Sequence, residues 1–321
     1  MAKEKDITEK QLEALDDVFA DMINALVFNG RQVVKEDELE PAIPQSQFKA
    51  GSAIHEQERD VAKFWKNGHI RLALFGSENQ TEADPDMPLR VFSYDGASYK
   101  EQVLQHESAK RKKDARITPF PTYPAITLVL HFGKKPWDGP TTLFECFGVD
   151  IPDELKPFLN DYRLNVIDIA YLTPEQVRLF KSDFRIVADY FVQSRISGDY
   201  IPSPEKLTHV DEVLKLMAAL TRDDRFIHVV NNSGLLRSEE GGISMCEVLD
   251  KVEQRGFAAG QAKGKAEGKA EGKAEGKAER DSFYGKLMQL LAPLGRLDEL
   301  IAATSDQAKL ASLAKEFGLE I

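Results

Sequence analysis

Asp60, Glu78 and Gln80 are the residues whose types and spacing point most directly to chemistry. They flank the dipeptide Asn67-Gly68, which is typical of a two-residue type I′ turn and predicts a hairpin formed by RDVAKFW and HIRLALFGSENQ. In such a hairpin the start of the first strand lies beside the end of the second, so the two carboxylates meet at one edge. Paired carboxylates can bind a hard divalent cation through their oxygens. The alternative interpretation is two exposed acids at strand ends, because this spacing alone is a loose pattern.

The register of this hairpin decides whether the acids share a face. Strict pairing about the turn opposes Asp60 to Phe75, whereas Glu78 and Gln80 lie on the other face of the second strand. We expect a β-bulge at Gly76 to correct the phase, since bulges favour glycine and re-aim the side chains that follow.

The elements around the hairpin must position these residues. Residues 7–28 have apolar side chains on one face and predict a helix, residues 30–57 indicate short strands and loops, and residues 86–113 predict a long helix. Short apolar runs at 124–133 and 163–172 are typical of strands. The order of helix, two strands, helix and strand indicates an α/β protein with a mixed sheet flanked by helices.

The second half of the chain is predicted to be mostly helical. Thr173 followed by Pro174 is a strong helix start. Further helices are expected at 181–196, at 204–221 and from about residue 243. Two short amphipathic helices are expected within residues 282–319.

A KAEG repeat occupies residues 260–279, where glycine recurs at every fourth position. Lys and Glu stand two residues apart, so no opposite-charge i,i+4 pair forms. Each glycine also costs about 1 kcal/mol relative to alanine inside a helix. Two interpretations stay open: a flexible charged tether, or a helix held by a partner that uses the Gly/Ala stripe for close approach.

Composition excludes several classes of protein. No apolar run approaches the roughly 20 residues that a membrane-spanning helix needs, and the charged N-terminus does not resemble a secretory signal. Cys146 and Cys246 form no CxxC pair, so neither a disulfide framework nor a structural zinc site is indicated. The expected location is the cytoplasm.

The charge distribution bears on nucleic-acid binding. A net charge of −11 argues against it, but residues 100–135 hold eight Lys or Arg against three acids. The strongest run comprises Lys110, Arg111, Lys112 and Lys113. A basic face of this kind suits phosphate contacts. Taken alone, the run is better interpreted as a solvated helix end.

Several blocks in order resemble one family, the Rpn recombination-promoting nucleases, also called putative transposases, of the PD-(D/E)XK nuclease superfamily. The blocks are FADMINALVFNG at 19–30, RD at 59–60, ENQ at 78–80, MPLRVFSYD at 87–95, YPAITLVLHFGKKPW at 123–137, FLNDYRLNVIDI at 158–169 and SMCEVLDKVEQRGFAAGQAKG at 244–264. The likeness covers nearly the whole chain from about residue 15.

The resemblance implies a restriction-endonuclease-like mixed sheet flanked by helices, and roles for individual residues. Asp60 and Glu78 match the two acids that bind Mg²⁺, or Mn²⁺ in its place. Gln80 stands where Lys is usual; it can orient water but brings no positive charge to the transition state. Asp21 is the best match to an assisting acid on the first helix.

Residues shortly after ENQ have two interpretations. Arg90, Tyr94 and Asp95 lie about one helical turn apart and could line the same cleft. Equally, Arg90 and Asp95 could form an ordinary ion pair, with Tyr94 in the core.

The sequence therefore predicts a nuclease-like domain over residues 10–200, a helical region at 201–259, the KAEG repeat as linker or helix at 260–280, and a C-terminal helical pair at 281–321. The expected function is metal-dependent hydrolysis of DNA phosphodiesters in recombination or mobile-element transactions. The basic run at 110–113 would hold the DNA backbone, and no membrane partner is expected. The alternative is a catalytically degenerate nuclease fold that acts as a DNA-binding or interaction module, assembling into a homo-oligomer through its C-terminal helices.

Overall fold

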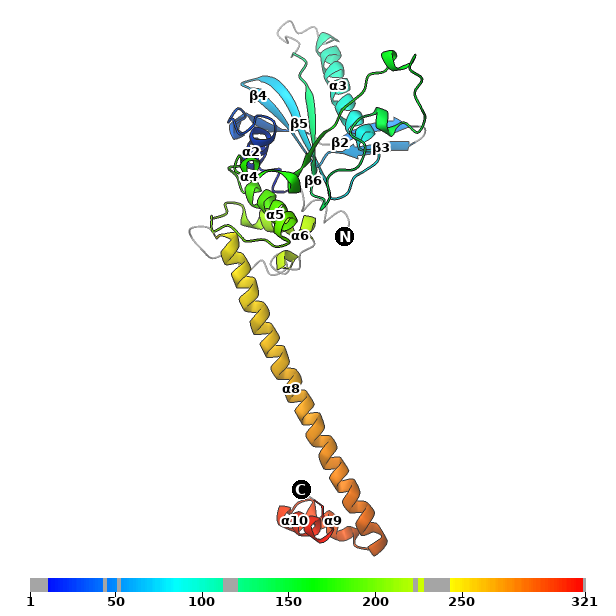
Figure 1. Ribbon diagram of the computed structural model, residues 1–321, viewed down its shortest axis with the longest axis vertical. Coiled ribbons are helices and arrows are strands. Elements are labelled where there is room, and N and C mark those ends of the chain that lie inside the picture. The colour runs from blue at the N-terminus through cyan, green and yellow to red at the C-terminus, as the bar shows by residue number, and fades with distance from the viewer. Residues whose placement is uncertain are drawn as a thin grey trace. The chain divides into compact units, whose positions relative to one another are not determined.

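The structure, a computed structural model, describes residues 11–42, 45–50, 53–111, 121–221, 225–227 and 243–319 (Figure 1). It contains two compact units, Met1–Val252 and Glu253–Ile321, which are described separately below. Within the described part of the chain, no helix combines the length and apolar composition that crossing a membrane requires.

A five-stranded mixed sheet forms the centre of the first unit, with strand order β1-β4-β5-β6-β7. Its strands are β1 (Leu39–Pro41), β4 (Val61–Asn67), β5 (Ile70–Gln80), β6 (Ala125–His131) and β7 (Asn165–Asp168). The β1–β4 and β4–β5 pairs are antiparallel, whereas β5–β6 and β6–β7 are parallel. A separate antiparallel pair consists of β2 (Gln45–Ala50) and β3 (Ala53–Glu58). The expected mixed α/β sheet flanked by helices is confirmed at this level.

The helices of the first unit follow the predicted order with shifted ends. They are α2 (Asp16–Leu26), α3 (Met87–Arg111), α4 (Pro174–Val177), α5 (Phe184–Ser197) and α6 (Val210–Thr221). Short 3₁₀ helices occupy Glu36–Glu38, Phe144–Cys146, Lys156–Phe158 and Ile169–Tyr171. The predicted helix start at Thr173 is confirmed, since its side chain accepts the Gln176 amide in a capping box. The strand expected at 163–172 is shorter, because a 3₁₀ turn replaces its second half.

Helices cover both faces of the sheet (Figure 1). The largest buried cluster joins α2, α5 and α6 to the inward residues of β5 and β6, among them Phe75 and Leu130. On the opposite face Met87 and Val91 of α3 pack against Val129 of β6. The length of α3 fits its role as the crossover between parallel strands β5 and β6, which no tight turn can connect.

The β4–β5 hairpin differs in register from the sequence prediction. Its two-residue turn is formed by Gly68 and His69, not by Asn67 and Gly68, and Asn67 pairs with Ile70. Gly68 has φ +59°, the value of a glycine at the first position of a type II′ turn. The predicted type I′ turn is therefore wrong. A type I′ turn needs a positive φ at both central residues, whereas in this turn only the first of them, Gly68, has one.

The predicted bulge at Gly76 is also wrong. The register shift lies between Trp65 and Lys66, and Gly76 pairs regularly with Ala62. Gly76 serves a different purpose: a Cβ on it would lie 2.6 Å from Cδ of Arg59.

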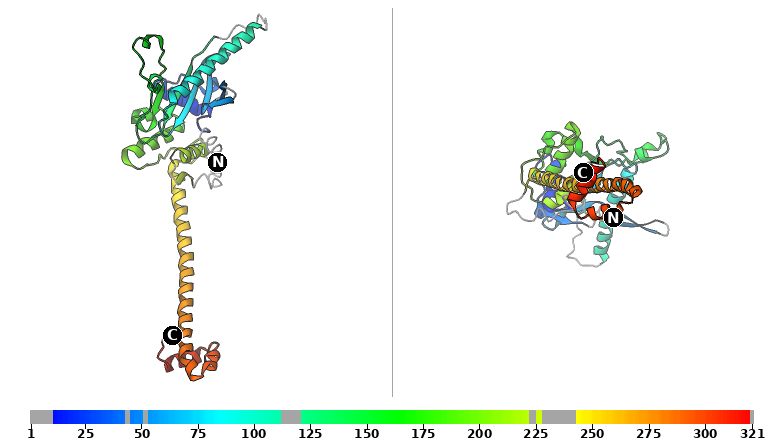
Figure 2. Two further views of the ribbon diagram at one scale, coloured as in Figure 1. Left: turned by 90° about the vertical axis from the view of Figure 1, so that its right-hand side faces the viewer. Right: turned by 90° about the horizontal axis from the view of Figure 1, so that it is seen from below.

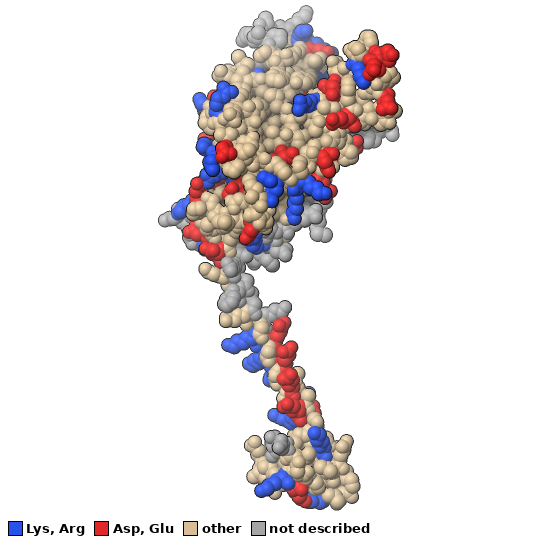
Figure 3. All heavy atoms as spheres, viewed as in Figure 1, with Lys and Arg blue, Asp and Glu red and all other residues tan. Residues whose placement is uncertain are grey.

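The KAEG repeat is helical. It lies within α8 (Met245–Leu291), which begins in the first unit and continues into the second as one uninterrupted helix (Figure 2). Residues 264–282 of this helix are exposed, and its Lys and Glu side chains follow different sides of the helix surface (Figure 3).

The second unit ends in a small helical cluster. After α8 come a 3₁₀ turn (Ala292–Leu294), α9 (Leu297–Ala303) and α10 (Gln307–Glu316). Leu287 and Leu291 of α8 pack with Leu300, Ala303 and Leu313 in its core. The predicted pair of short C-terminal helices is therefore observed as α9 and α10.

Candidate functional site

The open end of the β4–β5 hairpin brings the predicted acids into one region. Val61 pairs with Ser77, so the register continued by one residue places Asp60 opposite Glu78. The Asp60 amide donates to the Ser77 carbonyl at 3.1 Å, and the Asp60 carboxylate accepts the Asn79 amide at 2.6 Å. These two hydrogen bonds fasten the start of β4 to the end of β5. The bulge between Trp65 and Lys66 thus provides the phase that the sequence required of Gly76, whereas the changed turn moves the register by two residues and leaves the phase as it was.

Glu78 faces α3 and is only 2% exposed. Its Oε2 lies 3.4 Å from Nη2 of Arg90, and Arg90 also binds Oδ2 of Asp84 at 2.6 Å. The Tyr94 hydroxyl accepts from Arg90 at 3.2 Å. Burial, followed by the nearby Glu78 carboxylate, raises the pKa of Tyr94. The structure therefore places Arg90 and Tyr94 beside Glu78, and Tyr94 lies in the core, as the second interpretation predicted, with 2% of its surface exposed.

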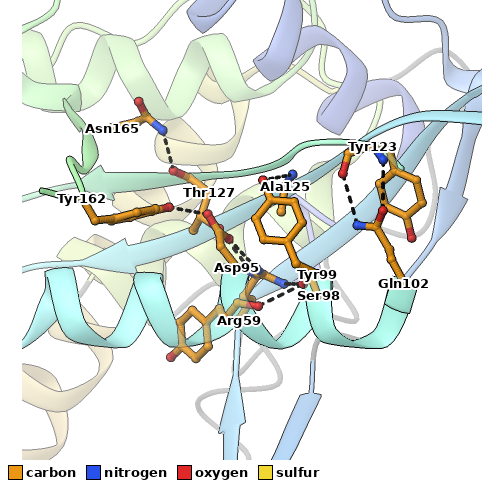
Figure 4. A network of polar contacts seen from close by, with 11 residues as sticks. Arg59, Asp95, Ser98, Tyr99, Gln102, Tyr123, Ala125, Thr127, Tyr162 and Asn165 are labelled. Atoms are coloured by element: carbon orange, nitrogen blue, oxygen red, sulfur yellow. Dashed lines mark hydrogen bonds and ion pairs between the residues drawn. The ribbon is translucent and has the colours of Figure 1, made fainter. Parts of the chain in front are cut away.

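Asp95 belongs to a different cluster, so the alternative Arg90–Asp95 ion pair is not formed. Its carboxylate binds Nη2 of Arg59 at 2.6 Å, and both side chains are 3% exposed. Thr127 donates to the same carboxylate at 2.8 Å, and Tyr162 donates to its other oxygen (Figure 4). This network joins α3 and β6 to the residue immediately before Asp60. It holds the start of β4 in place from within the core.

Gln80 is the last residue of β5 and is half-buried. It pairs in register with His131 of the parallel strand β6, and its carbonyl accepts the Phe132 amide at 2.7 Å. The His131 ring lies 2.5 Å from the Asp168 carboxylate. Gln80 therefore stands two residues beyond Glu78 at the carboxyl end of β5.

Asp21 has a structural role at another place. It is buried on α2, and its Oδ2 accepts the amides of Lys181 and Ser182, both at 2.7 Å. Both of these amides belong to the segment before α5 and not to the hairpin. It anchors the segment that leads into α5.

Glu13 lies beside the end of β5, where it contacts two side chains of that strand. It is fully buried, accepts from Ser77 Oγ at 3.0 Å and accepts from Asn79 Nδ2 at 2.8 Å. Burial, together with the negative charge of Asp60, raises the pKa of Glu13 to about 7. Sequence reasoning missed Glu13, because the surrounding apolar pattern predicted a helix in which an acid normally faces solvent.

The basic run lies only partly within the described residues. Lys110 and Arg111 end α3 and are exposed, and Arg111 lies 3.8 Å from Glu107 one turn earlier. Lys112 and Lys113 lie outside the described residues.

The donor set for a metal consists of two carboxylates. In the described ranges no group of three or more His, Cys, Asp or Glu side chains is arranged to hold an ion. Mg²⁺ commonly keeps several waters and takes only one or two protein carboxylates together with substrate phosphates. Asp60 and Glu78 fit that pattern in number and chemistry. The Arg90 guanidinium beside Glu78 competes with a cation for the same carboxylate.

Comparison with known protein families, with curated proteins and with solved structures finds no match to this chain.

Proposed function

We propose that the protein is a metal-dependent DNA endonuclease with a PD-(D/E)XK-like fold, acting in recombination or mobile-element DNA transactions. The observation that carries the proposal is the hairpin register, which sets Asp60 opposite Glu78 at one end of the sheet. The turn at Gly68 and His69 and the shift at Trp65 together produce this register. The bulge is the irregularity that sets both acids on one face of the hairpin, and this supports a shared role for them.

Asp60 and Glu78 would hold Mg²⁺ or Mn²⁺. Such an ion, when bound, polarises a phosphodiester and makes its water more acidic. Gln80, two residues further along β5, orients the attacking water by hydrogen bonding. Arg90 lies beside Glu78 and supplies the positive charge that Gln80 lacks, which favours the negative charge of the transition state.

Glu13 adds less negative charge beside Asp60 than an ordinary glutamate would, because its pKa is raised. With a pKa near 7, it is protonated in about half of the molecules at neutral pH. A protonated Glu13 repels neither Asp60 nor an approaching phosphate. The exposed Lys110 and Arg111, with Lys112 and Lys113 after them, would bind the DNA backbone by counterion release.

Plasmid nicking tests the proposal. Purified protein is incubated with supercoiled DNA in Mg²⁺, in Mn²⁺ and in EDTA, and Asp60→Asn and Glu78→Gln are compared with wild type. Asp138→Asn is the matched control, because this exposed acid lies outside the hairpin. We expect metal-dependent nicking that is lost in the first two variants and kept in the control. Nicking that survives both substitutions would show that the acids are not the site.

A specific observation also favours the catalytically degenerate alternative. Glu78 is almost completely buried and already paired with Arg90, as expected of an acid that serves the fold. In that case the chain would act as a DNA-binding or interaction module that assembles through its C-terminal helices. Mn²⁺ would then leave the melting temperature unchanged, and DNA binding would persist without cleavage in any metal.

A further inference from the structure

A cavity of about 920 Å³ opens at the carboxyl ends of the three parallel strands. Asn79 and Thr81 contribute to its wall at the end of β5, Gly133 at the end of β6, and Ala170 after β7. Helix α5 and the end of α6 close the opposite side. Open α/β sheets characteristically bind ligands outside the carboxyl ends of their parallel strands. The volume also lies within the usual range of small-molecule sites.

Tyr171 contacts the Arg195 guanidinium and the backbone of Lys134, and Lys134, Arg195 and Arg225 all line this cavity. The Tyr171 hydroxyl donates to the Lys134 carbonyl at 3.1 Å, and the Arg195 guanidinium lies over the Tyr171 ring, 4.5 Å from its centroid. Nε of Arg195 donates to the Ala170 carbonyl at 2.6 Å, which fixes the plane of the guanidinium. Throughout the described residues, no carboxylate forms an ion pair with Lys134 or Arg195. Arg195 therefore offers an anion a cation of fixed orientation, and Lys134 offers an exposed one on the same cavity wall.

The remaining wall is suited to a planar ring. Tyr190 of α5 is half-buried and presents the aromatic wall, whereas Phe132 and Phe191 also line the cavity but are only 3% and 9% exposed. Glu82 and Asp199 line it as well, and their negative charges disfavour an anion away from the two cations. A ligand that matches this wall has one anionic group and one planar ring.

We propose that the cavity binds one unpaired nucleotide of a single-stranded DNA segment. Lys134 and Arg195 contact its phosphate, and its base lies against the aromatic wall. The nucleotide must be unpaired, because a base within a duplex cannot leave its stack without being flipped out. The choice of DNA rests on the proposed function, and the cavity lies next to Asn79, the residue after Glu78.

Anisotropy of a fluorescein-labelled single-stranded oligonucleotide tests this in EDTA, where no metal-dependent cleavage occurs. We expect Lys134→Ala and Arg195→Gln each to weaken binding about tenfold, the loss of one charge-assisted contact. The slope of log K against log salt should also fall by about 0.7 for each lost phosphate contact. Lys135→Ala is the matched control, because it removes an exposed neighbouring cation that does not line the cavity.

A second variant addresses the cavity without changing charge. Ser194 lines the wall on α5, so Ser194→Phe fills the space where the base would lie. We expect it to weaken single-strand binding while leaving binding of a blunt duplex unchanged. Melting curves of all variants confirm that each is folded before its affinity is compared.

The source of the nucleotide is decided by competition with deoxyadenosine monophosphate and with inorganic phosphate. Weak competition by either, with tight oligonucleotide binding that depends on both cations, supports a strand as the ligand. The proposal is overturned if Lys134→Ala and Arg195→Gln weaken binding no more than Lys135→Ala. It is also overturned if the free mononucleotide alone depends on these cations. Because the binding assay runs in EDTA and needs no catalysis, it tests the cavity even if nicking is never observed.

Discussion

Replacing Asp95 with asparagine leaves the Arg59 guanidinium without its counter-charge in the interior of the first unit. The Asp95 carboxylate accepts from Arg59 at 2.6 Å, from Thr127 at 2.8 Å and from Tyr162 (Figure 4). Burial, followed by the hydrogen bond to Asp95, raises the pKa of Tyr162, so its hydroxyl stays protonated and remains a donor. The carboxylate is therefore the common acceptor of three buried donors.

The expected magnitude follows from the burial of the pair. Both side chains are 3% exposed, so water cannot replace the lost charge. Removing one partner of a buried ion pair typically costs about 3–5 kcal/mol. In a unit of this size that corresponds to a fall in melting temperature of roughly 6–20 °C.

Urea denaturation followed by tryptophan fluorescence measures this loss. Both tryptophans, Trp65 and Trp137, belong to the first unit, so the signal reports its unfolding and not that of the C-terminal helices. Glu175→Gln is the matched control: its pair with Arg178 is about three-quarters exposed, so its loss should leave the free energy of unfolding almost unchanged.

A double substitution sharpens the test. Arg59→Met together with Asp95→Asn removes both charges, and we expect it to cost less than the sum of the single substitutions. If Asp95→Asn lowers the free energy of unfolding by less than about 1 kcal/mol, the buried pair is not what stabilises this region. Strict additivity of the two substitutions would contradict the argument equally.

Three further predictions concern other parts of the chain. The pKa of Glu13 is about 7 in the folded protein against an ordinary 4.5, so the folded state binds this proton more tightly than the unfolded state does. As pH rises from about 4.5 to about 7, the free energy of unfolding of wild type should fall by on the order of 3 kcal/mol relative to that of Glu13→Gln. Urea titrations in EDTA that show parallel pH profiles for the two proteins would contradict this. Gly76→Ala should lower the free energy of unfolding by about 1–3 kcal/mol, because its Cβ would meet Arg59. Gly96→Ala on the exposed surface of α3 meets nothing within 4 Å and should raise it by up to about 1 kcal/mol. Equal melting temperatures of the two variants would refute the packing argument. Gly272→Ala in α8 should increase the helical far-UV circular dichroism signal that remains at elevated temperature. Alanine favours a helix by about 1 kcal/mol relative to glycine, and nothing lies within 4 Å of this position. An unchanged thermal profile would show that helix propensity does not limit this helix.

The elements with strong local signals were predictable. Thr173 followed by Pro174 predicted a capped helix, and the cap is present. The apolar run at 124–133 predicted the buried strand β6, and the long helix before it is α3. These features depend on propensity and periodicity within short windows, which the sequence contains directly.

The register and the partners of buried polar groups were not predictable in the same way. One residue of slip reverses every side chain of a strand, and that slip comes from the bulge between Trp65 and Lys66, which the sequence prediction placed at Gly76. The function of Gly76 became clear only from Arg59, which approaches it from outside the hairpin. Sequence spacing cannot show such an approach.

By itself, the sequence determined which residues could do chemistry, the order of the main elements and the helical character of the second half. The tertiary structure decided that Asp60 lies opposite Glu78, that Arg90 pairs with Glu78 and not with Asp95, and that Asp21 anchors the backbone before α5. It also buried Glu13 beside the hairpin and raised its pKa. The physical reason is that composition and periodicity act over a few residues, whereas burial and charge pairing depend on which distant segments pack together.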